Sequence, residues 1–178
     1  TALDYYGRLL VIAEELGDKG GIGLSHNNIG NVHADKGDYE KALDYLNRSL
    51  TIREEIGDKR NVAYSLGSIG NVYYDKGDFK KAEKYFEMTL ANDKEIGLGA
   101  DDLLWSTTCL YIAYKNLGKD YDINEIHRLI KETKNIEFEL NLQLYQLLED
   151  ASYLETAYNQ IQEKASAMDD GANFLSYP

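Results

Sequence analysis

Apolar residues in the first hundred positions recur at intervals of three and four, which predicts amphipathic helices rather than strands. Over residues 21–36 they are Ile22, Ile29, Val32 and Ala34, and over residues 39–56 they are Ala42, Tyr45, Leu46, Leu50 and Ile52. Gly37-Asp38 separates the two segments and Gly57-Asp58 follows the second. Glycine suits the left-handed position that ends a helix, and aspartate caps the helix that follows. The pattern therefore predicts a helical hairpin closed by tight turns.

The same pattern returns forty residues later. Of the 40 positions in residues 22–61, 16 are identical without gaps in residues 62–101, including the pairs Gly30/Gly70 and Asn31/Asn71. Residues 1–21 match the second half of an earlier copy, because Ala2-Leu3-Asp4-Tyr5 corresponds to Ala42-Leu43-Asp44-Tyr45. Self-similarity at a fixed spacing is typical of a solenoid, in which one helical hairpin stacks on copies of itself.

Small residues at fixed positions indicate where the two helices of a hairpin cross. Gly30 and Gly70 lie on the first helix of each copy, and Ala42 and Ala82 lie on the second. A glycine inside a helix costs about 1 kcal/mol relative to alanine. We therefore expect the helix axes to approach closely at these glycines.

These residues resemble the tetratricopeptide repeat (TPR) family. Its pattern of a large residue, Leu-Gly and Tyr, followed by Ala, an aromatic residue and Ala, is filled here by Leu66, Ile69-Gly70, Tyr73, Ala82, Phe86 and Thr89. The earlier copy has His26, Ile29-Gly30, His33, Ala42, Leu46 and Ser49 in those places. The period is 40 rather than the usual 34 or so, and Glu54 and Lys94 stand where the family has its closing proline. Longer helices joined by Gly-Asp-Lys turns resemble the extended repeats of kinesin light chain and of bacterial signalling proteins. The Gly-Asp-aromatic turn argues against HEAT and armadillo repeats, which have similar lengths.

The resemblance implies an all-α, right-handed superhelix of stacked antiparallel helix pairs. Beyond residue 101 the repeat decays, and we expect helices over 103–117, 121–134, 137–150 and 152–168. The last pair has an apolar stripe that consists of Leu140, Leu144, Leu147, Leu148, Leu154, Tyr158 and Ile161. The expected domain spans 1–178, with a half repeat (1–21), repeats 22–61 and 62–101, a degenerate repeat (102–135) and a capping pair (136–178).

Composition narrows the classes of function. The chain has 178 residues and a net charge of −12, which disfavours nucleic acids and anionic membrane surfaces as partners. A single cysteine, Cys109, excludes an internal disulfide and a multi-cysteine metal site. No apolar run approaches the roughly 18 residues of a membrane span. The chain opens inside a predicted helix without a signal peptide, and we expect a fragment of a longer cytoplasmic protein.

No set of residues predicts catalysis, and we expect a non-enzymatic chain with no cofactor and no metal. His26 and His33 are seven residues apart and are interpreted as partly buried core histidines. Cys109 has no neighbouring His or Asp in the sequence, so a small buried apolar role is favoured. The glycines of residues 20–23 lack the following Lys-Ser/Thr of a phosphate loop.

In this family the first helix of each pair lines a concave groove. The resemblance places groove residues at Leu24, Asn27, Asn28, Asn31, Asp35, Tyr64, Ser68, Asn71, Tyr74 and Asp75, and we expect Trp105 and Cys109 to continue the row. The amides of Asn31 and Asn71 offer a donor and an acceptor, which match an extended peptide backbone. The alternative is that they bond a neighbouring helix. Asp35 and Asp75 favour a ligand with Lys or Arg beside apolar residues.

Three functions remain open at this stage. The first is a non-catalytic module that binds an extended peptide or another segment of its parent chain. The second is the regulatory region of a larger signalling enzyme, because residues 152–158 and Asn173-Phe174-Leu175 resemble the end of repeat regions in adenylate and guanylate cyclases. The third is self-association through residues 1–16, where Leu3, Leu9, Leu10 and Ile12 form an apolar strip.

Overall fold

The computed structural model describes the backbone of residues 1–174 and the side chains of residues 1–167. This part of the chain contains helices and no strand. The helices are α1 (Ala2–Leu16), α2 (Lys19–Asp35), α3 (Tyr39–Glu55), α4 (Lys59–Asp75), α5 (Phe79–Glu95), α6 (Ala100–Leu117), α7 (Ile123–Glu132), α8 (Phe138–Leu148) and α9 (Ala151–Phe174). The expected all-α repeat architecture is confirmed.

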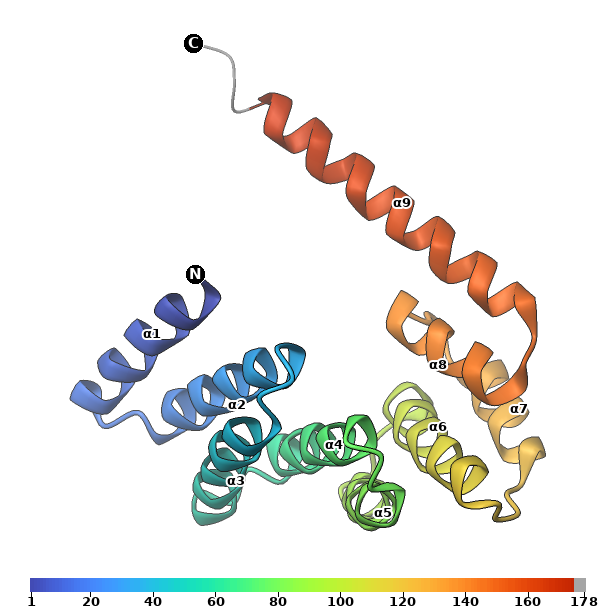
Figure 1. Ribbon diagram of the computed structural model, residues 1–178, viewed down its shortest axis with the longest axis horizontal. Coiled ribbons are helices and arrows are strands. Elements are labelled where there is room, and N and C mark those ends of the chain that lie inside the picture. Colours follow the sequence, from blue (N-terminus) through green and yellow to red (C-terminus); the bar gives the residue numbers. More distant parts are fainter. Residues whose placement is uncertain (175–178) are drawn as a thin grey trace.

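The helical hairpins stack along an arc (Figure 1). Helix α2 packs against α3, α4 against α5, and α8 against α9. Figure 1 shows α2, α4, α6 and α8 on the inner side of this arc, with α3, α5 and α7 on the outer side. Contacts between α2 and α4, and between α6 and α8, join the inner helices to one another.

The turns follow the glycine-aspartate pattern. Gly37 and Gly57 have φ angles of 76° and 70°, a left-handed conformation that ends the preceding helix at little steric cost. The carboxylate of Asp58 then accepts a hydrogen bond from the backbone N–H of Asn61. Asp38 differs, because its carboxylate makes no such cap and lies 3.3 Å from His33 Nδ1 instead.

The predicted close crossings are present at both glycines. A Cβ atom added to Gly30 would lie 2.7 Å from Leu46 Cγ, and one added to Gly70 would lie 2.6 Å from Phe86 Cε1. Leu46 and Phe86 are both buried. Glycine therefore recurs because the opposing side chain occupies the space of a Cβ.

A buried polar network joins the first two repeats, and the sequence did not predict it. The Arg53 guanidinium donates hydrogen bonds to the Asn61 carbonyl and to Ser65 Oγ, both at 2.8 Å, and to Asn27 Oδ1 at 3.3 Å. Burial lowers the pKa of Arg53. Forty residues later the same position holds Asp93, which is also buried and whose pKa is raised by that burial. The two repeat interfaces thus contain buried ionisable groups of opposite sign.

The packing of α8 and α9 differs from the expectation that one apolar stripe of both helices is buried. Leu140, Leu144 and Leu147 of α8 are buried, but Leu154, Tyr158 and Ile161 of α9 are 41%, 61% and 40% exposed. The reason is that α9 presents a different face to α8. Gln160 is hydrogen-bonded to Asn141, and Lys164 is ion-paired with Glu137. Helix α9 also extends beyond the expected residue 168, and α6 begins at Ala100 rather than at residue 103.

At the other end, α1 places only part of its apolar strip in solvent. Leu9 and Ile12 are exposed, whereas Leu3 and Leu10 are partly covered. The side chains of Asn173 and Phe174, and the whole of Leu175, lie outside the described residues. None of the helices in the described part of the chain has the length and apolarity needed to cross a membrane.

Candidate functional site

The inner side of α2 carries a row of side chains that are exposed or half-buried. Leu24, Asn28, Asn31 and Asp35 follow one another at intervals of four, three and four, so they share one side of the helix. Leu24 is 52% exposed, Asp35 is exposed, and the two asparagines are half-buried. The sides of α2 that pack against α1 and α3 carry other residues, including Gly21 and Gly30.

Helix α4 repeats this row forty residues later. Tyr64 is 51% exposed, Asn71 is half-buried and Asp75 is exposed, while Ser68 between them is buried. We call the eight residues of the two rows the inner face: Leu24, Asn28, Asn31, Asp35, Tyr64, Ser68, Asn71 and Asp75.

The asparagines of the inner face differ from most others in the chain. Side-chain hydrogen bonds hold Asn47, Asn116 and Asn141 to other residues, and none holds Asn31 or Asn71 among the described residues. Each of these two amides therefore keeps a donor and an acceptor available at the same point of successive repeats.

Asn27 is not part of the inner face, contrary to the sequence-based expectation. Its side chain is 0% exposed, and its Oδ1 accepts hydrogen bonds from Arg53 and from Ser65 Oγ at 3.2 Å. One position separates it from Asn28, but that step of about 100° turns the side chain into the repeat interface. Asn27 stabilises the stacking of the repeats.

The row does not continue along α6, because α8 lies against that side of the helix. Cys109 is buried with its Sγ 3.7 Å from Gln143 Oε1, and burial raises its pKa to about 12. The expected groove position of Cys109 is therefore wrong. Trp105 is partly buried, and its ring lies so close to α4 that a Cβ on Gly67 would be 2.5 Å from Trp105 Cη2.

Tyr74 closes the inner face on the side of α6. Its hydroxyl accepts a hydrogen bond from Asn116 Nδ2 at 3.3 Å and another from Gln146 Nε2. These contacts join α4, α6 and α8 and leave Tyr74 partly buried. The available side chains are therefore those of α2 and α4.

The inner face is acidic at one end. Partial burial raises the pKa of Asp75, and the charge of Asp35 raises it further. Among the described residues no ion pair involves either carboxylate, although the neighbouring Lys76 pairs with Glu40. At the other end, the Tyr64 ring lies over the Arg53 guanidinium, with 5.8 Å between its centroid and Cζ.

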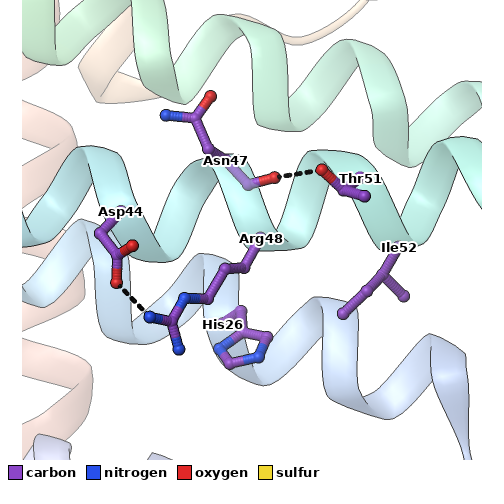
Figure 2. Close-up of a pocket in the computed structure, with 6 residues that line it drawn as sticks. All are labelled: His26, Asp44, Asn47, Arg48, Thr51 and Ile52. Carbon is purple, nitrogen blue, oxygen red and sulfur yellow. Dashed lines mark hydrogen bonds and ion pairs between the residues drawn. The ribbon is translucent and has the colours of Figure 1, made fainter.

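A second, separate feature is a shallow, open surface pocket of about 360 Å³ between α2 and α3 (Figure 2). Six side chains line it, namely His26, Asp44, Asn47, Arg48, Thr51 and Ile52. Arg48 is ion-paired with Asp44 at 2.8 Å, and Thr51 donates to the Asn47 carbonyl at 3.0 Å. His26 is buried, which confirms it as a core histidine, and burial lowers its pKa.

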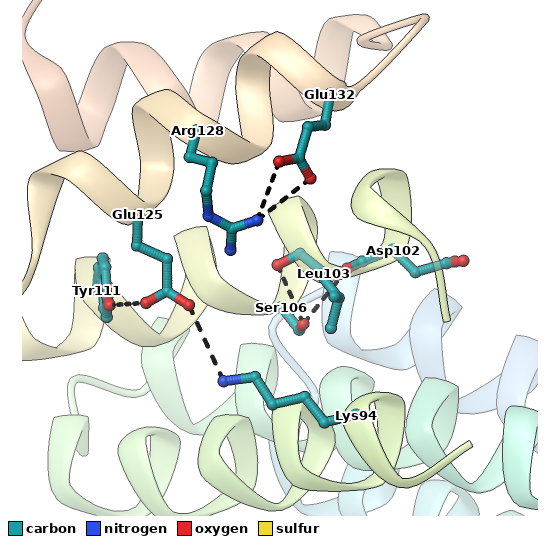
Figure 3. Close-up of polar contacts among 8 residues, drawn as sticks. All are labelled: Lys94, Asp102, Leu103, Ser106, Tyr111, Glu125, Arg128 and Glu132. Atoms are coloured by element: carbon teal, nitrogen blue, oxygen red, sulfur yellow. Dashed lines mark hydrogen bonds and ion pairs between the residues drawn. The ribbon is translucent and has the colours of Figure 1, made fainter. Parts of the chain in front are cut away.

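Another polar cluster joins α5, α6 and α7 (Figure 3). The Tyr111 hydroxyl donates to Glu125, which also lies 3.9 Å from Lys94 Nζ, and Arg128 pairs with Glu132 at 3.1 Å. The Ser106 hydroxyl lies within hydrogen-bond distance of the backbone carbonyls of Asp102 and Leu103. Within the described residues, no group of three or more His, Cys, Asp and Glu side chains is arranged to hold a metal ion.

A family model described as tetratricopeptide repeat matches residues 1–55 and 21–95, which together cover more than half of the chain. The chain belongs to the tetratricopeptide repeat family. The TPR region so defined includes both rows of the inner face. No curated protein matches the chain.

Solved structures give the same fold. BtubC (BKLC) from P. vanneervenii is similar with a TM-score of 0.60 and 20% identity, over 72% of this chain and 52% of that one. This chain thus spans about half the length of that protein. A variant of a Podosopora anserina protein assigned to the kinesin light chains, with nearly identical TPR-like repeats, has a TM-score of 0.60 and 13% identity over 96% and 87% of the two chains. The N-terminal domain of stress-induced protein-1 from C. elegans has a TM-score of 0.50 and 11% identity over 80% and 97%.

Proposed function

We propose that this chain is a non-catalytic binding module whose inner face holds an extended peptide segment of a partner protein, in keeping with the interactions between proteins that TPR repeats generally mediate. The observation that carries the proposal is the pair Asn31 and Asn71, two amides at the same position of adjacent repeats that no described residue satisfies. An extended backbone presents N–H and C=O groups that such amides can pair with.

The side chains around the amides define the class of peptide. Leu24 and Tyr64 offer exposed apolar area at one end of the two rows. Asp35 and Asp75 follow Asn31 and Asn71 by one helical turn and offer unneutralised carboxylates at the other end. An extended segment that crosses α2 and α4, with apolar side chains on one side of its backbone and Lys or Arg on the other, complements this arrangement.

The test uses pools of random peptides of about twelve residues, long enough to span two repeats when extended. One pool is enriched in Lys and Arg and the other in Asp and Glu. We expect the basic pool to bind more tightly at about 50 mM NaCl, with an advantage that shrinks at about 300 mM as the charges are screened. Preference for the acidic pool would overturn the assignment of ligand charge.

The amides are tested by the double variant Asn31→Ala/Asn71→Ala. Because both side chains lie partly in solvent, we expect unchanged thermal stability and peptide affinity reduced by about tenfold or more. Asn159→Ala is the matched control, since Asn159 is an exposed asparagine of α9 whose side chain makes no hydrogen bond among the described residues. If the double variant binds the selected peptides as well as the control does, the amides are not ligand contacts.

A further inference from the structure

The apolar side of α9 has no partner in the described part of the chain. Leu154, Tyr158 and Ile161 are exposed although they are large, and α9 projects away from α8 in Figure 1. Helix α9 has 24 residues and α8 has 11, so much of α9 extends beyond the helix on which it packs.

The equivalent side of the outer helix α5 shows what the exposed apolar side of α9 would contact in a longer stack of repeats. Phe86 of α5 packs on the preceding inner helix, α4, and Ala157 and Gln160 of α9 face the preceding inner helix, α8. When Ala157 is aligned with Phe86, Leu154 and Tyr158 correspond to Glu83 and Glu87. Those glutamates contact the next repeat, since Glu87 accepts a hydrogen bond from the Tyr114 hydroxyl of α6 at 3.1 Å and Glu83 is ion-paired with Lys119, which follows α6. The exposed stripe of α9 is thus a face that receives another helix.

The spacing of the stripe is that of a coiled coil. Ala151, Leu154, Tyr158, Ile161 and Ala165 follow at intervals of three, four, three and four, and the sequence keeps this spacing at Met168 and Ala172. A strict alternation of three and four is the heptad pattern by which two helices pack knobs into holes.

The stripe is complementary to itself when two copies of α9 run antiparallel. With Tyr158 opposite Ile161 of the second copy, Leu154 falls opposite Ala165, so that a large side chain meets a small one. In the parallel arrangement Ala165 would face Ala165 of the second copy and leave a gap. Asp150 would also approach Glu155 of the second copy, and the two negative charges would repel each other. A two-fold symmetric pairing needs only this one surface.

We propose that this chain forms a two-fold symmetric dimer through an antiparallel pairing of α9 along the stripe from Ala151 to Ala165. The occupant of the stripe is a second copy of the chain. This interface is separate from the inner face, and the two proposals stand or fall independently.

The first test is sedimentation equilibrium of the whole chain. We expect a mass twice the 20.2 kDa of the chain at micromolar concentration. Ile161→Glu should weaken the dimer by about 100-fold or more, since every dimer contains the substitution twice. Thr156→Glu adds the same charge at an exposed position of α9 outside the stripe and should leave the dimer intact. A monomer at all concentrations, or a dimer that Ile161→Glu does not weaken, would overturn the proposal.

The second test determines the direction of pairing. Chains with Leu154→Cys and chains with Ala165→Cys are oxidised separately and as a mixture. The antiparallel register predicts a disulfide-linked dimer in the mixture only, because residue 154 lies opposite residue 165. The native Cys109 is buried and does not compete. A disulfide in the Leu154→Cys chain alone would show a parallel pairing and refute the register.

Discussion

Replacing Gly70 by alanine tests how tightly the two helices of the second full repeat cross. The new Cβ would lie 2.6 Å from Phe86 Cε1 and 2.7 Å from Cδ1, closer than real Cβ contacts occur. Phe86 is buried, so its ring can move only by disturbing the core. Such overpacking typically costs about 1–3 kcal/mol. Because the contact would be as short as 2.6 Å, we take the upper part of this range, about 2–3 kcal/mol. Alanine regains up to about 1 kcal/mol of helix propensity, so we expect a net loss of roughly 1–2 kcal/mol in the free energy of unfolding.

The assay is urea unfolding followed by circular dichroism, with Gly7→Ala as the control. Gly7 is also inside a helix, but a Cβ there would meet no atom within 4 Å. Only the gain in propensity applies, so Gly7→Ala should be neutral or stabilise the protein by up to about 1 kcal/mol. If Gly70→Ala is as stable as the wild type or more so, close approach is not the reason for glycine at this position.

Three further predictions concern the interior. Arg53→Met should lower the free energy of unfolding by about 2–4 kcal/mol, because it leaves the Asn61 carbonyl without its side-chain donor and removes one of the two donors to Asn27 Oδ1; a loss below about 0.5 kcal/mol would show that this network contributes little. Burial raises the pKa of Asp93 above its unfolded value of 3.8, so its carboxylate opposes folding at neutral pH and this penalty disappears as the pH falls through the raised pKa toward 3.8. Asp93→Asn should therefore raise Tm at pH 7 more than at pH 4, and an equal change at both would contradict the raised pKa. Gly67→Ala should displace the ring of Trp105, the only tryptophan, and move its fluorescence to longer wavelength, whereas unchanged emission would contradict the contact.

Features that depend on one repeat and its copy were predictable from the sequence. The turns at Gly37 and Gly57 and the crossings at Gly30 and Gly70 repeat at a fixed spacing, so each copy supports the interpretation of the other. The rows on α2 and α4 follow from the same register.

Features that depend on a neighbour of unrelated sequence were not predictable. Asn27 is buried because Arg53 reaches it, and the next copy has Asp93 in place of that arginine. Cys109 is buried because α8 lies over α6, a contact between divergent repeats. Leu154 was predicted to be buried because it lies on an apolar helical stripe. It is exposed because no helix in the described part of the chain covers it.

The central claim is that the inner face of α2 and α4 binds an extended peptide through Asn31 and Asn71. The most direct measurement is the NMR spectrum of the asparagine side-chain NH₂ groups during titration with a peptide selected from the basic pool. Binding at the inner face predicts that the signals of Asn31 and Asn71 shift with the bound fraction while that of Asn47 on α3 does not. Shifts confined to Asn47 and the pocket around His26, with Asn31 and Asn71 unmoved, would contradict it.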